Sequence, residues 1–235
     1  MRDLGAWVAQ RRREAQAAAP LDAHLVTPSL RDLGAALRTG RRDLVGIPTV
    51  SPADDAAAAE AAGWAAAADV AAVAVELGGS FAAVRALSER LSTTPLLLLD
   101  PIVAEGQVLA SRLAGADAVA LPVGSLGEGE LRRLAEAARS TLMSPVFAIR
   151  TGGEWEVARR LDARFLLVSA PDGALTGAVE LARHLSPRVS ACLWADGLDS
   201  PAALRALVGS ADGALLGTAC PASCWPDLAV LEPEQ

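Results

Sequence analysis

Short apolar runs recur along the whole chain, and segments of helical character separate them. This alternation constrains the fold more than any other feature of the sequence. Strands that alternate with helices form parallel sheets, because each helix carries the chain back to the start of the next strand. The apolar runs predict strands at Leu44–Pro48, Val70–Glu76, Pro95–Leu99, Ala118–Leu121, Val146–Arg150, Phe165–Ser169, Val189–Trp194 and Ala214–Gly217.

About eight strand–helix units favour a closed barrel over an open sheet. The fold predicted from these units is therefore α/β, a (β/α)8 TIM barrel in a single domain of residues 1–235. Residues 1–42 are expected to form an N-terminal helical extension with a helix over Ala6–Ala18, and residues 43–235 the barrel. Hydrophobic residues make up 52% of the chain and aromatic residues 3%, so Ala, Leu and Val must fill strands that are buried on both faces.

One internal echo supports a repeated architecture. The segment Ala114–Leu121 resembles Gly209–Leu216, and each combines a helix end, a tight turn with an Asp, and a buried strand. Barrels built from similar units produce echoes of this kind.

Composition excludes several classes of function. The net charge is −7 with a pI of about 4.9, which disfavours nucleic acid because its phosphate backbone would be repelled. No apolar stretch approaches the roughly 20 residues that a membrane span needs. Cys192, Cys220 and Cys224 lack His at metal-ligand spacing, so we expect small buried thiols in a reducing cytoplasm, with no metal and no cofactor.

Several stretches resemble the indole-3-glycerol phosphate synthase family in order and spacing over nearly the whole chain. These stretches are Ala6–Leu25, Arg31–Leu37, Gly46–Pro52, Leu77–Ser80, Leu99–Val103 with Gln107, Ala114–Leu121, Phe147–Arg150, Val168–Asp172, Trp194–Leu198 and Leu216–Ala219. The resemblance implies a barrel that closes the indole ring of a phosphorylated carboxyanilino sugar with loss of carbon dioxide and water. It also implies catalytic Lys, Glu and Asn residues at the strand ends.

The chain departs from the family at those catalytic positions. By the resemblance, they are occupied by Gly46, Pro48, Leu99, Ala148, Ser169 and Ala195. The chain contains no lysine, and all 21 basic residues are arginine. A biased base composition would explain Arg in place of Lys, but it does not explain Gly, Pro and Leu. The favoured hypothesis is a non-catalytic family member, a pseudoenzyme, that binds a phosphorylated small molecule or a protein partner.

The resemblance also implies a phosphate site in the loops after the seventh and eighth strands, where backbone N–H groups hold the anion. Ser51, Gly197, Gly217 and Thr218 are the candidates for this site. Tight turns would require Gly at the same positions, so a purely structural role remains equally open.

Two alternatives keep catalysis. A remodelled enzyme could use Asp100, Arg150 and Asp196 at the strand ends, supported by Glu76 and Asp172 and by a divalent metal. These side chains could instead cap helices, pair with each other or face solvent, which is usual at a barrel rim. Residual synthase activity is the less favoured alternative. Trp194 is expected to fill space that the catalytic groups would otherwise occupy.

Overall fold

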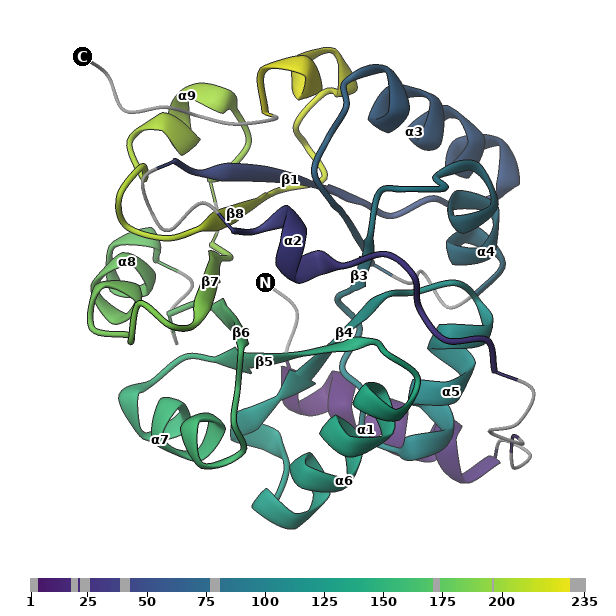
Figure 1. Cartoon of the computed structure of the whole chain (residues 1–235), viewed down its shortest axis with the longest axis vertical. Helices are drawn as coiled ribbons and strands as arrows, with labels where there is room; N and C mark the ends of the chain where they lie inside the picture. Colours follow the sequence, from purple (N-terminus) through teal and green to yellow (C-terminus); the bar gives the residue numbers. More distant parts are fainter. Residues whose placement is uncertain are drawn as a thin grey trace.

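The computed structural model describes residues 4–17, 21, 26–38, 43–76, 81–170, 174–195 and 197–228. Its strands form one closed parallel barrel in chain order, β1 to β8, and β1 pairs with β8 (Figure 1). The predicted (β/α)8 barrel is thereby confirmed. The strands are β1 (Val45–Val50), β2 (Val73–Val75), β3 (Leu96–Leu98), β4 (Ala118–Pro122), β5 (Ser144–Ile149), β6 (Phe165–Val168), β7 (Ser190–Leu193) and β8 (Gly213–Leu216).

Helices surround the barrel, and side-chain caps define several of their starts. Asp54, Thr151 and Ser200 each accept a hydrogen bond from a backbone N–H of the first turn, and Pro201 follows Ser200 at the start of its helix. The helices are α1 (Leu4–Ala17), α2 (Leu33–Ala36), α3 (Asp55–Ala67), α4 (Phe81–Arg90), α5 (Glu105–Leu113), α6 (Glu128–Ser140), α7 (Gly152–Arg160), α8 (Leu175–Arg183) and α9 (Pro201–Arg205). Two 3-10 helices follow β4 and β8, η2 (Val123–Ser125) and η3 (Ala222–Leu228). None of the described helices is long and apolar enough to cross a bilayer.

The two helices before β1 lie at opposite ends of the barrel. Helix α2 covers the end where the strands begin, here called the base, and lies across its centre in Figure 1. Leu37, the C-cap of α2, lies 3.2 Å from where a Cβ on Gly213 would be. Helix α1 lies at the other end, where the Gln107 side-chain amide at the start of α5 donates to the Arg11 carbonyl oxygen at 2.9 Å.

Two polar residues ahead of α2, Ser29 and Asp32, have different roles. Asp32, and not Ser29, caps this helix and accepts from the Gly34 N–H at 2.8 Å. The Ser29 hydroxyl instead donates to Asp117 at 2.7 Å. Ser29 therefore does not cap α2, because its hydroxyl is bonded to a buried carboxylate.

Buried apolar side chains form two clusters, one inside the barrel and one between the strands and the helices. The inner cluster takes residues from all eight strands, together with Leu33 of α2 and its C-cap, Leu37. The outer cluster takes the alternate strand residues and the inward faces of the helices. Successive side chains of a strand point to opposite faces, so cluster membership identifies which residues line the barrel interior.

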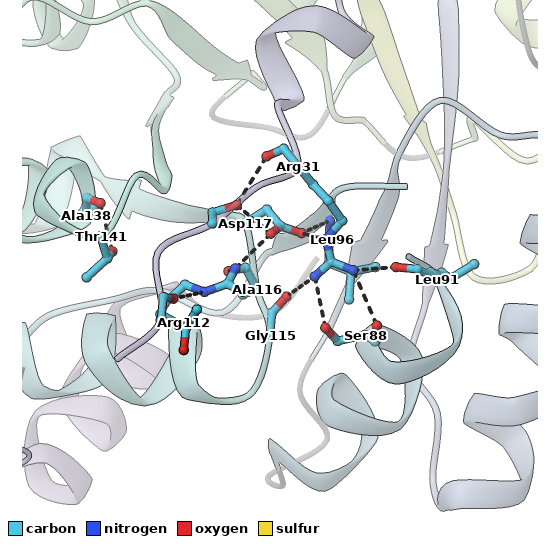
Figure 2. A network of polar contacts seen from close by, with 12 residues as sticks. Arg31, Ser88, Leu91, Leu96, Arg112, Gly115, Ala116, Asp117, Ala138 and Thr141 are labelled. Atoms are coloured by element: carbon cyan, nitrogen blue, oxygen red, sulfur yellow. Dashed lines mark hydrogen bonds and ion pairs between the residues drawn. The ribbon is translucent and has the colours of Figure 1, made fainter. Parts of the chain in front are cut away.

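A dense polar network joins the N-terminal segment to the base (Figure 2). Asp117, at the start of β4, is fully buried and forms ion pairs at 2.7 Å with Arg31 and with Arg112. Its second oxygen accepts from the Leu96 N–H at 2.9 Å. Arg31 also donates to the carbonyl oxygens of Leu91 and Gly115. These bonds anchor residues 27–31 beneath the barrel.

The internal echo of the sequence is visible in this network. Asp212 accepts from the Ala191 N–H at 2.9 Å, as Asp117 does from Leu96. Gly115 lies two residues before Asp117 and Gly209 three residues before Asp212, and both glycines have positive φ, at 98° and 83°. The units β3–α5–β4 and β7–α9–β8 therefore share the hydrogen bond from the preceding strand to the Asp.

Candidate functional site

The interior side chains of the barrel stack in layers, each with one residue from every second strand. The strand register groups Thr49, Leu99, Ala148 and Trp194 in the layer nearest the carboxyl ends of β1, β3, β5 and β7. We call this layer the floor. Leu99, Ala148 and Trp194 all belong to the inner cluster or pack against it. Three of the four floor residues are thus apolar, and none can transfer a proton at neutral pH.

Above the floor, the register continues into a second layer from the other four strands. It contains Glu76, Pro122, Ser169 and Gly217. Ser169 is buried, Glu76 is half-buried and Gly217 is exposed. These residues form the mouth of the barrel, the face that carries the active site in barrel enzymes.

Solvent reaches the floor through the mouth. Ala148 and Trp194 face the interior, yet both are partly exposed. Beneath them the interior is closed, because Ile47, Leu97 and Val146 are at most 3% exposed. The accessible depth of the barrel therefore ends at the floor.

Thr49 carries an unusual polar group on the floor. The residue is 7% exposed, and its hydroxyl is buried without a hydrogen-bond partner among the described residues. A buried hydroxyl without a partner costs about 1–3 kcal/mol in lost solvation. Nothing in the resemblance singled out Thr49, and only the strand parity reveals that it faces the interior.

The structure brings some predicted catalytic positions to the mouth and turns others away. Leu99 and Ala148 lie on the floor, and Ser169 lies in the layer above. Gly46 and Pro48 pair with Ala214 and Leu216, which belong to the outer cluster, and alternate with interior Val45 and Ile47. Ala195 packs against the outer cluster. On β1 and β7 the interior positions nearest the mouth are therefore Thr49 and Trp194.

The residues of the alternative rim site do not converge in the described part of the chain. The Arg150 Nη2 lies 3.6 Å from where a Cβ on Gly124 would be, over η2, and its backbone N–H donates to Glu154 at 2.6 Å. Asp100 is 2% exposed, at the end of β3. Asp172 and Asp196 lie outside the described residues. Among the described residues, no group of three His, Cys, Asp or Glu side chains could hold a metal ion.

The predicted phosphate loop has fewer free donors than the sequence suggested. The Gly217 N–H donates to the Leu198 carbonyl oxygen at 2.7 Å, so this N–H is occupied. The chain then turns, with the Cys220 N–H bonded to the Gly217 oxygen at 3.0 Å, and enters the 3-10 helix η3. Gly197 has a φ of 80° and open space where a Cβ would be. Thr218 and Ser51 are exposed.

The cysteines have the properties of buried thiols. Burial, followed by the nearby charge of Asp212, raises the pKa of Cys192 to about 12. Burial and the adjacent Cys224 thiol raise the pKa of Cys220 to about 11. Thiols with raised pKa values are poor nucleophiles at neutral pH. Neither thiol is therefore suited to covalent catalysis.

The fold and the mouth define a (β/α)8-barrel protein with its candidate site at the carboxyl ends of the strands. Comparison with protein families identifies the particular family. The model of the family described as indole-3-glycerol phosphate synthase matches residues 5–220. The chain therefore belongs to the indole-3-glycerol phosphate synthase family.

Known proteins agree with this assignment. An indole-3-glycerol phosphate synthase from a Nocardioides species is 39% identical over 128 residues, which are 54% of this chain and 48% of that protein. The match thus spans about half the length of that relative.

Solved structures share the fold at lower identity. The 2-keto-3-deoxy-6-phospho-gluconate aldolase from Zymomonas mobilis is 14% identical with a TM-score of 0.65, over 86% of this chain and 98% of its own. The 3-keto-L-gulonate-6-phosphate decarboxylase from Vibrio cholerae is 14% identical with a TM-score of 0.61, over 80% and 97%. A chain of the Pyrococcus furiosus tryptophan synthase complex is 16% identical with a TM-score of 0.59, over 76% and 88%.

Proposed function

We propose that this chain is a non-catalytic member of its family that binds a phosphorylated small molecule at the mouth of the barrel. The observation that carries the proposal is the composition of the floor. Thr49, Leu99, Ala148 and Trp194 occupy the interior positions nearest the mouth, and none of them is an acid or base at neutral pH. One general acid or base is typically worth about 10²–10⁴-fold in rate, so loss of several leaves binding without turnover.

The charge and hydrogen-bonding groups of the rim support a phosphorylated ligand, and they support only weak binding. Arg150 supplies a guanidinium, and no described residue pairs with it. Thr218 supplies an exposed hydroxyl, and Gly197 leaves open space beside the backbone. Because the Gly217 N–H is already bonded, we expect millimolar affinity, about −4 kcal/mol.

The remodelled-enzyme alternative has less support. Its central cation, Arg150, has its Nη2 atom over Gly124, and two of its proposed partners, Asp172 and Asp196, lie outside the described residues. Metal-dependent turnover of a phosphorylated sugar would favour this alternative over the proposal.

The absence of synthase activity is tested directly. Pure protein is incubated with the carboxyanilino deoxyribulose phosphate substrate of the family, and indole absorbance is followed. We expect no indole-3-glycerol phosphate. Turnover within about 100-fold of the ordinary enzyme median of 10 per second would disprove the proposal. The variant Leu99→Lys alone should remain inactive, because grouped catalytic residues act as a unit.

Phosphate binding is tested by titrating inorganic phosphate while recording backbone amide NMR shifts. We expect saturable shifts at Gly197 and Thr218 in the millimolar range, and a small shift at Gly217, whose N–H is occupied. The variant Arg150→Ala should weaken the shifts, and Arg188→Ala, whose exposed side chain lies near the start of β7, serves as the matched control. No saturable shift by tens of millimolar would replace the ligand-binding proposal with the protein-partner one.

A further inference from the structure

We infer that Cys220 and Cys224 form a reversible disulfide on exposure to a low-molecular-weight disulfide, and that this bond alters the loop after β8. The two cysteines lie four residues apart, Cys220 before the helix η3 and Cys224 within it. The inference goes beyond the proposed function, because the bond needs no ligand at the mouth. Three features carry it: the convergence of the two residues, the difference in their exposure, and the hydrogen bonds of the turn that joins them to β8.

The backbone turns so that both cysteines reach one acceptor. The Pro221 carbonyl oxygen accepts from the Cys220 thiol, at 3.8 Å from Sγ, and from the Cys224 backbone N–H at 3.0 Å. The side chains of the two cysteines also lie within hydrogen-bonding reach of each other. Cysteines whose side chains point apart cannot be bridged without movement of the backbone. Here the side chains converge, so the two sulfurs can be joined without rearrangement of the strands or helices.

The two thiols differ in exposure, and this difference assigns their roles. Cys224 is partly exposed, whereas Cys220 is 7% exposed and belongs to the outer cluster. Burial and the neighbouring Cys224 thiol raise the pKa of Cys220 to about 11. The thiolate is the form that attacks a disulfide, and the attack requires access. Cys224 therefore reacts first with the small disulfide, and Cys220 reacts second.

The bond forms in two thiol–disulfide exchange steps. First, the Cys224 thiolate attacks one sulfur of the small disulfide, which gives a mixed disulfide and releases one small thiolate. Then Cys220 loses its proton to solvent and attacks the Cys224 sulfur, which releases the second small thiolate. The small disulfide gains two electrons, and the two cysteines lose two. Because the second step is intramolecular, the proximity of the two sulfurs offsets the high pKa of Cys220.

The disulfide changes the turn that follows β8. The Cys220 N–H donates to the Gly217 carbonyl oxygen at 3.0 Å and closes the turn that contains Thr218. The disulfide removes the S–H of Cys220 and with it the hydrogen bond to the Pro221 oxygen. The sulfur of Cys220 also moves from its place in the outer cluster toward Cys224. The turn therefore differs between the reduced and the oxidised protein.

The test exposes the full chain to oxidised glutathione at neutral pH, blocks the remaining thiols with an alkylating agent and maps all three cysteines by mass spectrometry. We expect Cys220 and Cys224 to be lost as thiols together, with the loss of two hydrogens and no glutathione retained, and dithiothreitol to restore both. Cys192, which is 3% exposed in the barrel interior, should stay reduced. Glutathione that remains on Cys224, or a pair that stays reduced, would overturn the inference.

Variants test the two roles. Cys220→Ala should retain glutathione on Cys224, because the second step has no thiol, whereas Cys224→Ala should leave Cys220 reduced. Cys192→Ala is the matched control and should form the disulfide at the wild-type rate. Modification of Cys220 in the Cys224→Ala variant, as fast as that of Cys224 in the wild type, would overturn the order of attack.

Backbone amide NMR of the ligand-free protein tests the effect on the loop. Oxidation should shift the amide signals of Gly217, Thr218 and Ala219, and the same treatment of Cys224→Ala should not. A disulfide that forms without these shifts would overturn the link to the loop. These measurements use no phosphate, so failure of the disulfide leaves the proposed phosphate binding standing, and absence of phosphate binding leaves the disulfide standing.

Discussion

The two ends of the barrel treat their polar side chains in opposite ways. At the base, both oxygens of Asp117 are bonded, through Arg31, Arg112, Ser29 and the Leu96 N–H. At the mouth, the hydroxyl of Thr49 and the charges of Glu76 and Arg150 have no partner among the described residues. The polar groups of the base are thus bonded to other residues of the chain, whereas those of the mouth are available to bind a ligand.

This difference matches the division of labour in (β/α)8 barrels, where the base supports stability and the mouth supports function. A protein that had lost every use for its mouth would be expected to pair or remove these groups, because unpaired buried polar groups lower stability. The apolar floor argues against the family's chemistry, and the unpaired groups argue for a remaining ligand. The contrast between bonded groups at the base and unbonded groups at the mouth leads to predictions for both ends of the barrel.

The largest effect is expected at the base. Asp117→Ala should lower the free energy of unfolding by about 3–5 kcal/mol, because it leaves two largely buried guanidinium groups without a counter-charge. Equilibrium unfolding in urea measures the change. Glu156→Ala removes an exposed ion pair with Arg159 and is the control, with an expected change within about 0.5 kcal/mol. A loss at Asp117 as small as the control would mean that the base network does not stabilise the fold.

Removing a hydroxyl should lower the free energy of unfolding at the base and raise it at the mouth. Ser29→Ala removes a donor to the buried Asp117 carboxylate and should cost about 1.5–3 kcal/mol, as for other hydrogen bonds to charged groups. Thr49→Val removes an unpaired buried hydroxyl and keeps the shape, so it should stabilise the ligand-free protein by about 1 kcal/mol. Urea unfolding of both variants checks the pair. Destabilisation by Thr49→Val would show that its hydroxyl is already satisfied.

The next effect is a loss of folding stability at alkaline pH, which we expect from the buried thiol of Cys192 in the barrel interior. The pKa of Cys192 is raised to about 12 in the folded state, above the value near 9 of an ordinary thiol. As pH rises above 9, the unfolded chain loses this proton first, so stability that is fully present below pH 9 is lost toward pH 12. The slope for one group is about 1.4 kcal/mol per pH unit.

The composition limits the side chains that titrate in this range, because the chain has no Tyr and no Lys. Cys220, whose pKa is raised to about 11, is a second contributor. Cys192→Ala should reduce the loss of stability between pH 9 and 11 by about 1.4 kcal/mol per pH unit and leave the part due to Cys220, after a small cost at pH 7 for the lost sulfur. Urea unfolding across this range measures both. An unchanged alkaline slope in the variant would assign the effect to another group.

The fold was predictable from the sequence because strand–helix alternation and the Asp117 and Asp212 echo are local patterns. Predicted strands such as Ala118–Leu121 differ from the observed ones by a few residues at most. The face of each strand was not predictable. Strands buried on both sides show near-continuous apolar runs, so nothing in Val45–Val50 marks which residues point inward.

Because the sequence does not show which residues of a strand point inward, only part of the candidate site could be predicted. A shift of one residue exchanges the two faces of a strand, so the sequence did not separate Leu99 and Ala148, which face the interior, from Gly46 and Pro48, which do not, and Thr49 remained unnoticed. The Gly217 N–H could not be excluded as a donor either, because its partner, the Leu198 oxygen, comes from a different strand–helix loop. Local motifs indicate a phosphate loop, but only the tertiary contacts show which donors are free.

The smallest effect is expected at Leu142, an exposed base residue with an unfavourable backbone conformation. Leu142 follows α6 next to Thr141, has a φ of 57° and is 63% exposed. Left-handed backbone costs a side chain with a Cβ about 1–2 kcal/mol, and glycine adopts it freely but loses more entropy on folding, about 0.5–1 kcal/mol. Leu142→Gly should therefore stabilise the protein by less than about 1 kcal/mol. Asp162 has a similar φ, of 54°, after α7, and Asp tolerates this region better, so Asp162→Gly is the matched control and should gain less. Thermal unfolding of the two variants side by side measures the difference. A loss of stability in Leu142→Gly would show that the packing of the leucine side chain at the base outweighs its backbone strain.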